Sequence, residues 1–175
     1  MAFDLVSVTG LWPILRRIPL LVALVGRWYF TQARMASLVY VDLFPRYESA
    51  RLDLGDVASF QLHLQMMNLT PFTLELDRAN FRFYCGGLPL EAHLLERRSI
   101  RSGASESLFL SGSISEGAAN QIATMHRGNP AYLEGNIEFN CSVRSFAKKV
   151  GSLSGVQTVI VNEAQRRRRK ESSDA

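Results

Sequence analysis

The segment FQLHLQM at residues 60–66 alternates apolar and polar side chains without a break. Its phenylalanine, leucines and methionine fall on one side of an extended chain, and its glutamines and His63 fall on the other. Because successive side chains of a strand point to opposite faces, this rhythm predicts a half-buried β-strand. The segment therefore indicates a sheet with one face in a hydrophobic core.

The same rhythm recurs downstream. Residues 72–77 place Phe72, Leu74 and Leu76 inward, and residues 79–85 continue the alternation with polar side chains outward. Turns are predicted at residues 68–71 and at Gly86-Gly87, because asparagine, proline and glycine favour turn conformations. Less regular apolar stretches predict four more strands, at residues 90–95, 106–111, 136–144 and 156–161.

One stretch of the body departs from alternation. Residues 115–127 are rich in small helix-forming residues, with Ser115 as a helix N-cap and a Gly-Asn-Pro stop at residues 128–130. Short strands at this spacing with one inserted helix are typical of a mainly β protein. We therefore expect a two-layer antiparallel β-sandwich.

The N-terminal region is apolar but interrupted. Residues 11–41 are mostly apolar, yet prolines at 13 and 19 and arginines at 16, 17 and 27 break the run. The uninterrupted stretch at residues 18–26 is shorter than the roughly 20 residues that a transmembrane helix needs. With Pro19 in a first turn, a helix is expected from about residue 19 to about Ser37.

Three interpretations of this N-terminal helix are open. It is an uncleaved signal-anchor, a helix lying in the membrane interface, or a helix packed on the domain or on a partner subunit. Membrane association, on either side of the membrane, is the favoured interpretation. The side chains expected to contact the membrane are Ile18, Leu20, Leu21, Leu24, Val25, Trp28 and Tyr29.

The formal charge of +4 depends on one basic run near the end of the chain. This run lacks the interleaved aromatic residues of a nucleic-acid-binding face, so nucleic acid is not the expected partner. A flexible basic tail is expected over residues 163–175, and it is solvated, bound to anionic headgroups, in contact with nucleic acid, or a targeting signal. Residues 1–44 are expected to form the helical membrane segment, and residues 45–162 the sandwich. The basic run consists of Arg166, Arg167, Arg168, Arg169 and Lys170.

Residues that carry chemistry are sparse and scattered. The three histidines, His63, His93 and His126, have no nucleophile motif beside them. Cys85 and Cys141 lack the spacing of a metal site, and they are either two separate buried thiols or one disulfide. Glu75 and Asp77 are expected on a solvated outer face. The sequence therefore predicts a non-catalytic protein with no metal, no cofactor and no small-molecule substrate.

Residues 68–87, NLTPFTLELDRANFRFYCGG, resemble the central signature of the late embryogenesis abundant group 2 family, also called the WHy domain. Residues 132–135, YLEG, before an alternating strand resemble the family's second marker, and the resemblance covers about residues 48–150. It implies a fibronectin-like sandwich of about seven strands, often behind a membrane anchor, with roles in stress protection, lipid handling or membrane-protein interaction. The turn reads Asn-Leu-Thr-Pro, whereas the family often has Asn-Pro-Asn.

These observations together lead to one functional expectation and one alternative. We expect a non-catalytic, membrane-associated module that binds lipid, an apolar ligand or a membrane protein. The alternative is a structural accessory subunit of a larger membrane protein complex, in which the N-terminal helix packs on partner helices.

Overall fold

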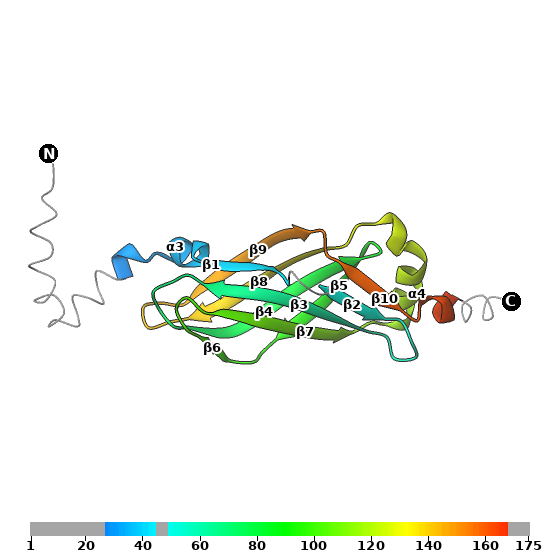
Figure 1. Cartoon of the computed structure of the whole chain (residues 1–175), viewed down its shortest axis with the longest axis horizontal. Helices are drawn as coiled ribbons and strands as arrows, with labels where there is room; N and C mark the ends of the chain where they lie inside the picture. Colours follow the sequence, from blue (N-terminus) through cyan, green and yellow to red (C-terminus); the bar gives the residue numbers. More distant parts are fainter. Residues whose placement is uncertain (1–26, 45–48, 168–175) are drawn as a thin grey trace, which may run out of the picture.

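A computed structural model describes residues 27–44 and 49–167. These residues form two five-stranded sheets whose inward faces share one hydrophobic core, the arrangement of a β-sandwich (Figure 1). Each sheet is built around one long strand. The two long strands, β3 (Ser59–Asn68) and β4 (Leu74–Cys85), follow each other in the chain.

The first sheet is arranged around β3. On one edge β3 pairs with β7 (Ser105–Ser113), and along its other edge lie β1 (Val39–Leu43) and β2 (Ala50–Asp53), all antiparallel. The strand β10 (Thr158–Val161) lies beside β2 and is parallel to it, which makes it the exception to the antiparallel pattern among the described strands.

The second sheet repeats this plan around β4. The strand β8 (Tyr132–Asn140) runs along one edge of β4, with β9 (Phe146–Ser154) beyond it. The other edge of β4 carries β5 (Leu88–Leu94) and β6 (Arg98–Ile100). All four of these pairings are antiparallel.

Helical segments lie at both ends of the sandwich. The short helix α3 (Gln32–Ser37) lies at one end, and α4 (Glu116–Met125) with the 3₁₀ turn η1 (His126–Gly128) lies at the other (Figure 1). Residues 163–167 are also helical and lie beside α4. The predicted N-cap is confirmed, since the Ser115 hydroxyl accepts a hydrogen bond from the Ala118 N–H.

The core depends on phenylalanines that fit against glycines of the neighbouring strand. Phe60 of β3 pairs with Gly112 of β7, and Phe81 of β4 pairs with Gly135 of β8. A Cβ atom on Gly112 would lie 2.5 Å from Phe60 Cε1, and one on Gly135 would lie 2.3 Å from Phe81 Cδ1. Any side chain at either glycine would therefore displace a fully buried aromatic ring.

The predicted strands are confirmed in position, with changes at their ends. Residues 74–77 and 79–85 belong to one strand, β4, which has a bulge between Leu76 and Arg78 that turns Ala79 inward, whereas Phe72 lies in the turn before this strand. The last predicted alternation ends at Asn140 instead of Arg144, because the Cys141 N–H bonds to the Arg144 carbonyl in a turn. The described residues form ten strands, whereas about seven were expected. The strands that were not predicted are β1, β2, β6 and β9.

The expected boundary after residue 44 is wrong for the described part of the N-terminal segment. Residues 39–43 form β1, which pairs with β3 and buries Val39 and Val41 in the core. The expected continuous helix is interrupted at Thr31, which is extended and caps α3 by accepting from the Arg34 N–H. Met35 of α3 is fully buried, so this helix packs on the sandwich and ends at the predicted Ser37.

The crossover from β3 to β4 is organised by the buried side chain of Asn68. Its Oδ1 accepts from the Thr70 N–H and from the Thr70 hydroxyl, at 3.0 and 2.7 Å. Its Nδ2 lies 2.8 Å from the carbonyl oxygen of Phe72, 3.0 Å from that of Ile100 and 3.2 Å from that of Arg101. One amide thereby joins the β3–β4 turn to the β6–β7 connection, both of which pass from one sheet to the other.

We expect the substitution Asn68→Ala to lower the free energy of unfolding by about 3 kcal/mol, because it leaves buried polar groups of Thr70, Ile100 and Phe72 without a partner. Urea unfolding with an unchanged m-value measures this loss. Asn136→Ala is the matched control, since the Asn136 side chain has no hydrogen bond among the described residues, and it should change stability by less than about 0.5 kcal/mol. Equal midpoints for the two variants would contradict the role of Asn68.

Candidate functional site

Exposed apolar side chains gather at the end of the sandwich that carries α3. Trp28 is 82% exposed, and Tyr29, Tyr40, Met67 and Leu69 are also exposed. The Leu69 N–H bonds to the Leu38 carbonyl at 2.9 Å, which joins the β3–β4 turn to the end of α3. We call this region the α3 end: residues 27–38, the turn 69–73, the connections 101–104 and 141–145, and the adjoining Tyr40 and Met67. The described part of the chain begins at this end of the sandwich (Figure 1).

The aromatic residues before α3 are held against the sandwich. The Phe30 ring packs edge-on against the Phe72 ring, with centroids 5.0 Å apart, and the Tyr29 ring packs edge-on against Phe30 at 5.1 Å. The Arg34 guanidinium lies 3.9 Å above the Tyr29 ring and donates to its hydroxyl at 2.7 Å. These contacts fix the backbone beside Trp28, while the Trp28 indole stays in solvent.

Arginines surround this apolar patch. Arg27, Arg34 and Arg101 are exposed, and Arg144 bonds to the Arg27 carbonyl from the β8–β9 connection. A further hydrogen bond joins α3 to the β8–β9 connection, where Gln32 Nε2 donates to the Ser145 carbonyl at 3.3 Å. The α3 end therefore combines exposed tryptophan and tyrosine with cationic side chains.

The residues expected to contact the membrane divide into two groups. Trp28 and Tyr29 are exposed at the α3 end, as a contact surface requires. None of the helices in the described ranges has the length and apolarity needed to cross a bilayer. The remaining expected contacts lie outside the described residues: Ile18, Leu20, Leu21, Leu24 and Val25.

The expectation of a flexible tail is wrong at its first basic residues. Arg166 is only 5% exposed, because residues 163–167 form a helical turn that docks beside α4. Its guanidinium donates to Asn120 Oδ1 at 2.7 Å, to the Gly55 carbonyl at 3.3 Å and to the Glu116 carbonyl at 3.2 Å. Arg166 is therefore a structural residue. Arg168, Arg169 and Lys170 lie outside the described residues.

Arg167 and Glu163 extend this docking. Arg167 Nε donates to the Ala123 carbonyl at 2.8 Å and its guanidinium pairs with Glu163. Glu163 also lies 3.6 Å from His126 Nε2, at the end of α4. A second contact links the end of β2 to the residue before the C-terminal helical turn. There Asp53 Oδ1 accepts from Asn162 Nδ2 at 2.7 Å and from the Gly55 N–H at 2.9 Å. These two bonds hold the pKa of Asp53 below its ordinary value.

We expect Arg166→Ala to cost about 2 kcal/mol of unfolding free energy, because the hydrogen bonds of this buried guanidinium to Asn120, Gly55 and Glu116 are lost. Chemical denaturation compares this variant with Arg101→Ala, which removes an exposed arginine and should have an effect below about 0.5 kcal/mol. A stability for Arg166→Ala as high as that of Arg101→Ala would show that the C-terminal helical turn is not docked.

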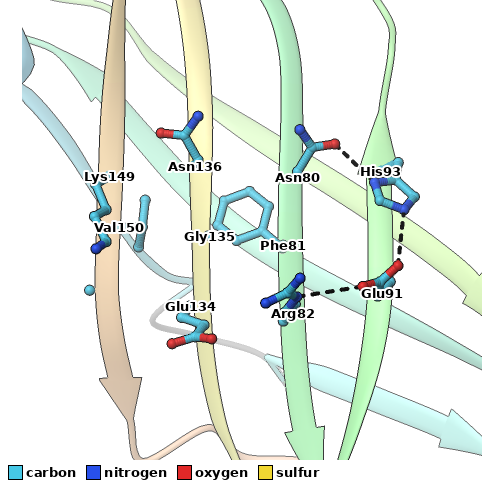
Figure 2. A pocket seen from close by; sticks show the side chains of 11 residues that line it. Asn80, Phe81, Arg82, Glu91, His93, Glu134, Gly135, Asn136, Lys149 and Val150 are labelled. Carbon is cyan, nitrogen blue, oxygen red and sulfur yellow. Dashed lines mark hydrogen bonds and ion pairs between the residues drawn. The ribbon is translucent and has the colours of Figure 1, made fainter.

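The structure does not bring the histidines together. His63 lies on the outer face of β3 against the Phe109 ring. His126 lies at the end of α4, with its Nδ1 3.1 Å from the Ile122 carbonyl oxygen. His93 lies on the outer face of the other sheet, where its Nδ1 is 2.9 Å from Asn80 Oδ1 (Figure 2). Within residues 27–44 and 49–167, no three histidine, cysteine, aspartate or glutamate side chains cluster in a way that suits a metal ion.

The two carboxylates of β4 are separated by its bulge. Glu75 is exposed at the start of the strand, whereas Asp77 lies next to the bulge with its Oδ1 3.5 Å from Arg97 Nε. The expectation of a solvated outer face therefore holds for Glu75, and Asp77 is partly covered by its arginine partner.

The two cysteines lie at opposite ends of β4 and β8. Cys85 ends β4 next to the Tyr84–Tyr132 pair, and Cys141 follows the Glu75–Asn140 pair at the far end. At a rise of about 3.3 Å per residue these ends are roughly 30 Å apart, far beyond disulfide distance. Both thiols are free. Burial raises the pKa of the Cys85 thiol to about 11.

We expect a thiol reagent at about pH 8 to modify Cys141 before Cys85, because the thiolate is the reactive form and Cys85 is buried and protonated. The progress curve with Ellman's reagent should show one fast thiol in the native chain and two thiols after unfolding. Cys141→Ser should remove the fast phase. Loss of that phase in Cys85→Ser instead would contradict the assignment.

Two solved structures resemble this chain at low sequence identity. Neither a family model nor a curated protein matches the chain. A protein of Arabidopsis thaliana with a known solution structure has a TM-score of 0.48 and 9% identity, over 68% of this chain and 82% of that one. A protein described as a late embryogenesis abundant (LEA) protein has a TM-score of 0.41 and 8% identity, over 85% of this chain and 84% of that one. No family model assigns a WHy domain to this chain.

Proposed function

We propose that this chain is a non-catalytic, WHy-like β-sandwich that attaches to a membrane surface through its α3 end. The observation that carries the proposal is the exposure of Trp28, at 82%, on a backbone that neighbouring residues hold in place. A large indole in water at a fixed position is costly unless something covers it. Tryptophan and tyrosine favour the headgroup region of a bilayer, where an apolar ring and a polar edge are both satisfied.

The surroundings of Trp28 support a bilayer as its partner. Leu69 and Met67 add apolar surface at the same end, and Arg27, Arg34 and Arg101 add positive charge around it. Each arginine near an anionic bilayer contributes about 1 kcal/mol, and this contribution weakens as salt rises. The mainly apolar sequence of residues 11–26 directly precedes this patch, so both would engage the same surface.

The proposal assigns a binding role and no reaction. In the part of the chain that the structure describes, the three histidines lie far from one another and the two cysteines lie at opposite ends of β4 and β8. Lipid, an apolar ligand at the membrane surface, or a membrane protein would be the partner of the α3 end. The WHy-like sandwich would hold that end rigidly, because β1 follows α3 directly.

We expect Trp28→Ala to weaken binding of the full-length chain to vesicles of phosphatidylcholine and phosphatidylserine by about tenfold or more, since the indole supplies the largest apolar area at the α3 end. Flotation of vesicles through a density gradient measures the bound fraction. Val57→Ala is the matched control, because Val57 is 83% exposed in the β2–β3 turn at the opposite end of the sandwich. Its binding should equal that of the unchanged chain.

Two results would contradict the proposal. A full-length chain that stays soluble without detergent and does not float with vesicles would exclude membrane attachment. Equal binding by Trp28→Ala and Val57→Ala would exclude the α3 end as the contact. If the purified chain instead keeps stoichiometric protein partners through Trp28, the accessory-subunit alternative replaces lipid attachment.

A further inference from the structure

A polar groove crosses the outer face of the second sheet, away from the α3 end. It is a depression of about 760 Å³ that runs over β9, β8, β4 and β5 (Figure 2). One wall is a row of cross-strand partners, Lys149, Asn136, Asn80 and His93. The opposite wall is the next outward row, formed by Glu134, Arg82 and Glu91. We call these residues, with Gly135 and Gly151 between them, the polar groove.

The groove exists because the positions between the two walls point inward. Phe81, Gly135 and Val150 are register partners between the rows, and the side chains of Phe81 and Val150 are buried in the core. Successive outward rows lie about 7 Å apart along a strand, which leaves a channel floored by backbone. The β8–β9 register shift places Gly151 in the groove, where a Cβ atom would meet nothing within 4 Å.

The side chains of the groove offer both donors and acceptors of hydrogen bonds. Asn136 and Lys149 make no side-chain hydrogen bond or ion pair with the rest of the described chain, so both are available. Glu134 accepts from the Tyr84 hydroxyl at 3.0 Å, which fixes its carboxylate at the wall. The Tyr84 ring stacks on the Tyr132 ring, with centroids 4.3 Å apart, in the next row beyond Glu134.

The charges of the groove are balanced. Arg82 lies between Glu134 and Glu91 in one wall, with its Nε 3.5 Å from Glu91 Oε1, and Lys149 lies in the other wall, so two cationic side chains accompany two carboxylates. A phosphate or sulfate ligand would need an excess of positive charge, and the carboxylates would repel it. An apolar ligand would strip water from amide and charged groups without replacing their hydrogen bonds.

We propose that the polar groove binds a neutral oligosaccharide laid across the strands. A hydroxyl group both donates and accepts, so a chain of sugar rings can accept from Lys149 and Asn136 and donate to Glu134 along one channel. The open, elongated form of the groove suits an extended ligand. This site lies apart from the α3 end and does not depend on membrane attachment.

The test is a titration of the full-length chain with cellohexaose, maltohexaose and chitohexaose, with inorganic phosphate as the charged probe. The solution must contain no glycoside detergent, because its headgroup would compete. Nuclear magnetic resonance should show amide shifts at Gly135 and Gly151 with at least one hexasaccharide and none with phosphate. Calorimetry then gives the affinity for that hexasaccharide.

Two variants place the ligand in the groove. Gly151→Leu fills the channel without steric conflict and should abolish sugar binding, whereas Gly117→Leu, the same change at an equally open glycine on α4, should have no effect. Asn136→Ala should weaken binding about tenfold by removing one hydrogen-bonding side chain. Urea midpoints confirm that all three variants fold.

Three outcomes would overturn the inference. The first is the absence of shifts with every hexasaccharide at millimolar concentration. The second is binding of phosphate at the same amides in preference to sugar. The third is sugar binding that survives Gly151→Leu, which would place the ligand elsewhere on the chain.

Discussion

The sandwich depends on one buried amide at the point where the chain passes between its two sheets. Asn68 ends β3 and holds the turn into β4, and the same side chain reaches the carbonyls of Ile100 and Arg101 on the return from β6 to β7. The buried polar groups of Asn68 and Thr70 need hydrogen-bond partners within the protein. The amide meets that need for both crossovers, so β3 and β4 are each placed at the centre of a sheet. Six strands pair directly with these two, and β10 and β9 then add to β2 and β8.

The sequence predicts the central strands well, because their core side chains alternate with polar ones along short continuous segments. The alternation at residues 60–66 corresponds to β3, and its change of phase between Leu76 and Ala79 corresponds to the bulge in β4. The strand β1 was hidden because its residues, VYVDL, continue an apolar run that resembles a membrane segment. β6 is only three residues long, and in β9 the register shift near Gly151 breaks the rhythm. Such segments become strands because they pair with a strand that is distant in the sequence, and the local sequence pattern carries no information about that pairing.

The proposed functional surfaces are harder to predict from the sequence, because each combines residues from segments that are distant in the chain. Arg166 looks like one member of a solvated basic run, yet its acceptors come from Gly55, Glu116 and Asn120. The polar groove assembles Asn80, Asn136 and Lys149 from three strands, and only the register of β4, β8 and β9 puts them in one row. Trp28 could be recognised from its neighbours in the sequence, whereas the arginines at 101 and 144 that share its end of the molecule could not.

The parallel pairing of β10 with β2 has a consequence for synthesis of the chain. Ala50 pairs with Thr158 and Asp53 pairs with Val161, so β2 cannot form this pairing until β10, more than 100 residues later in the chain, has been synthesised. While the ribosome is still making the intervening residues, the free edge of β2 presents unpaired backbone groups that a neighbouring nascent chain could join. The first sheet can therefore be completed only after the chain has been synthesised through Val161.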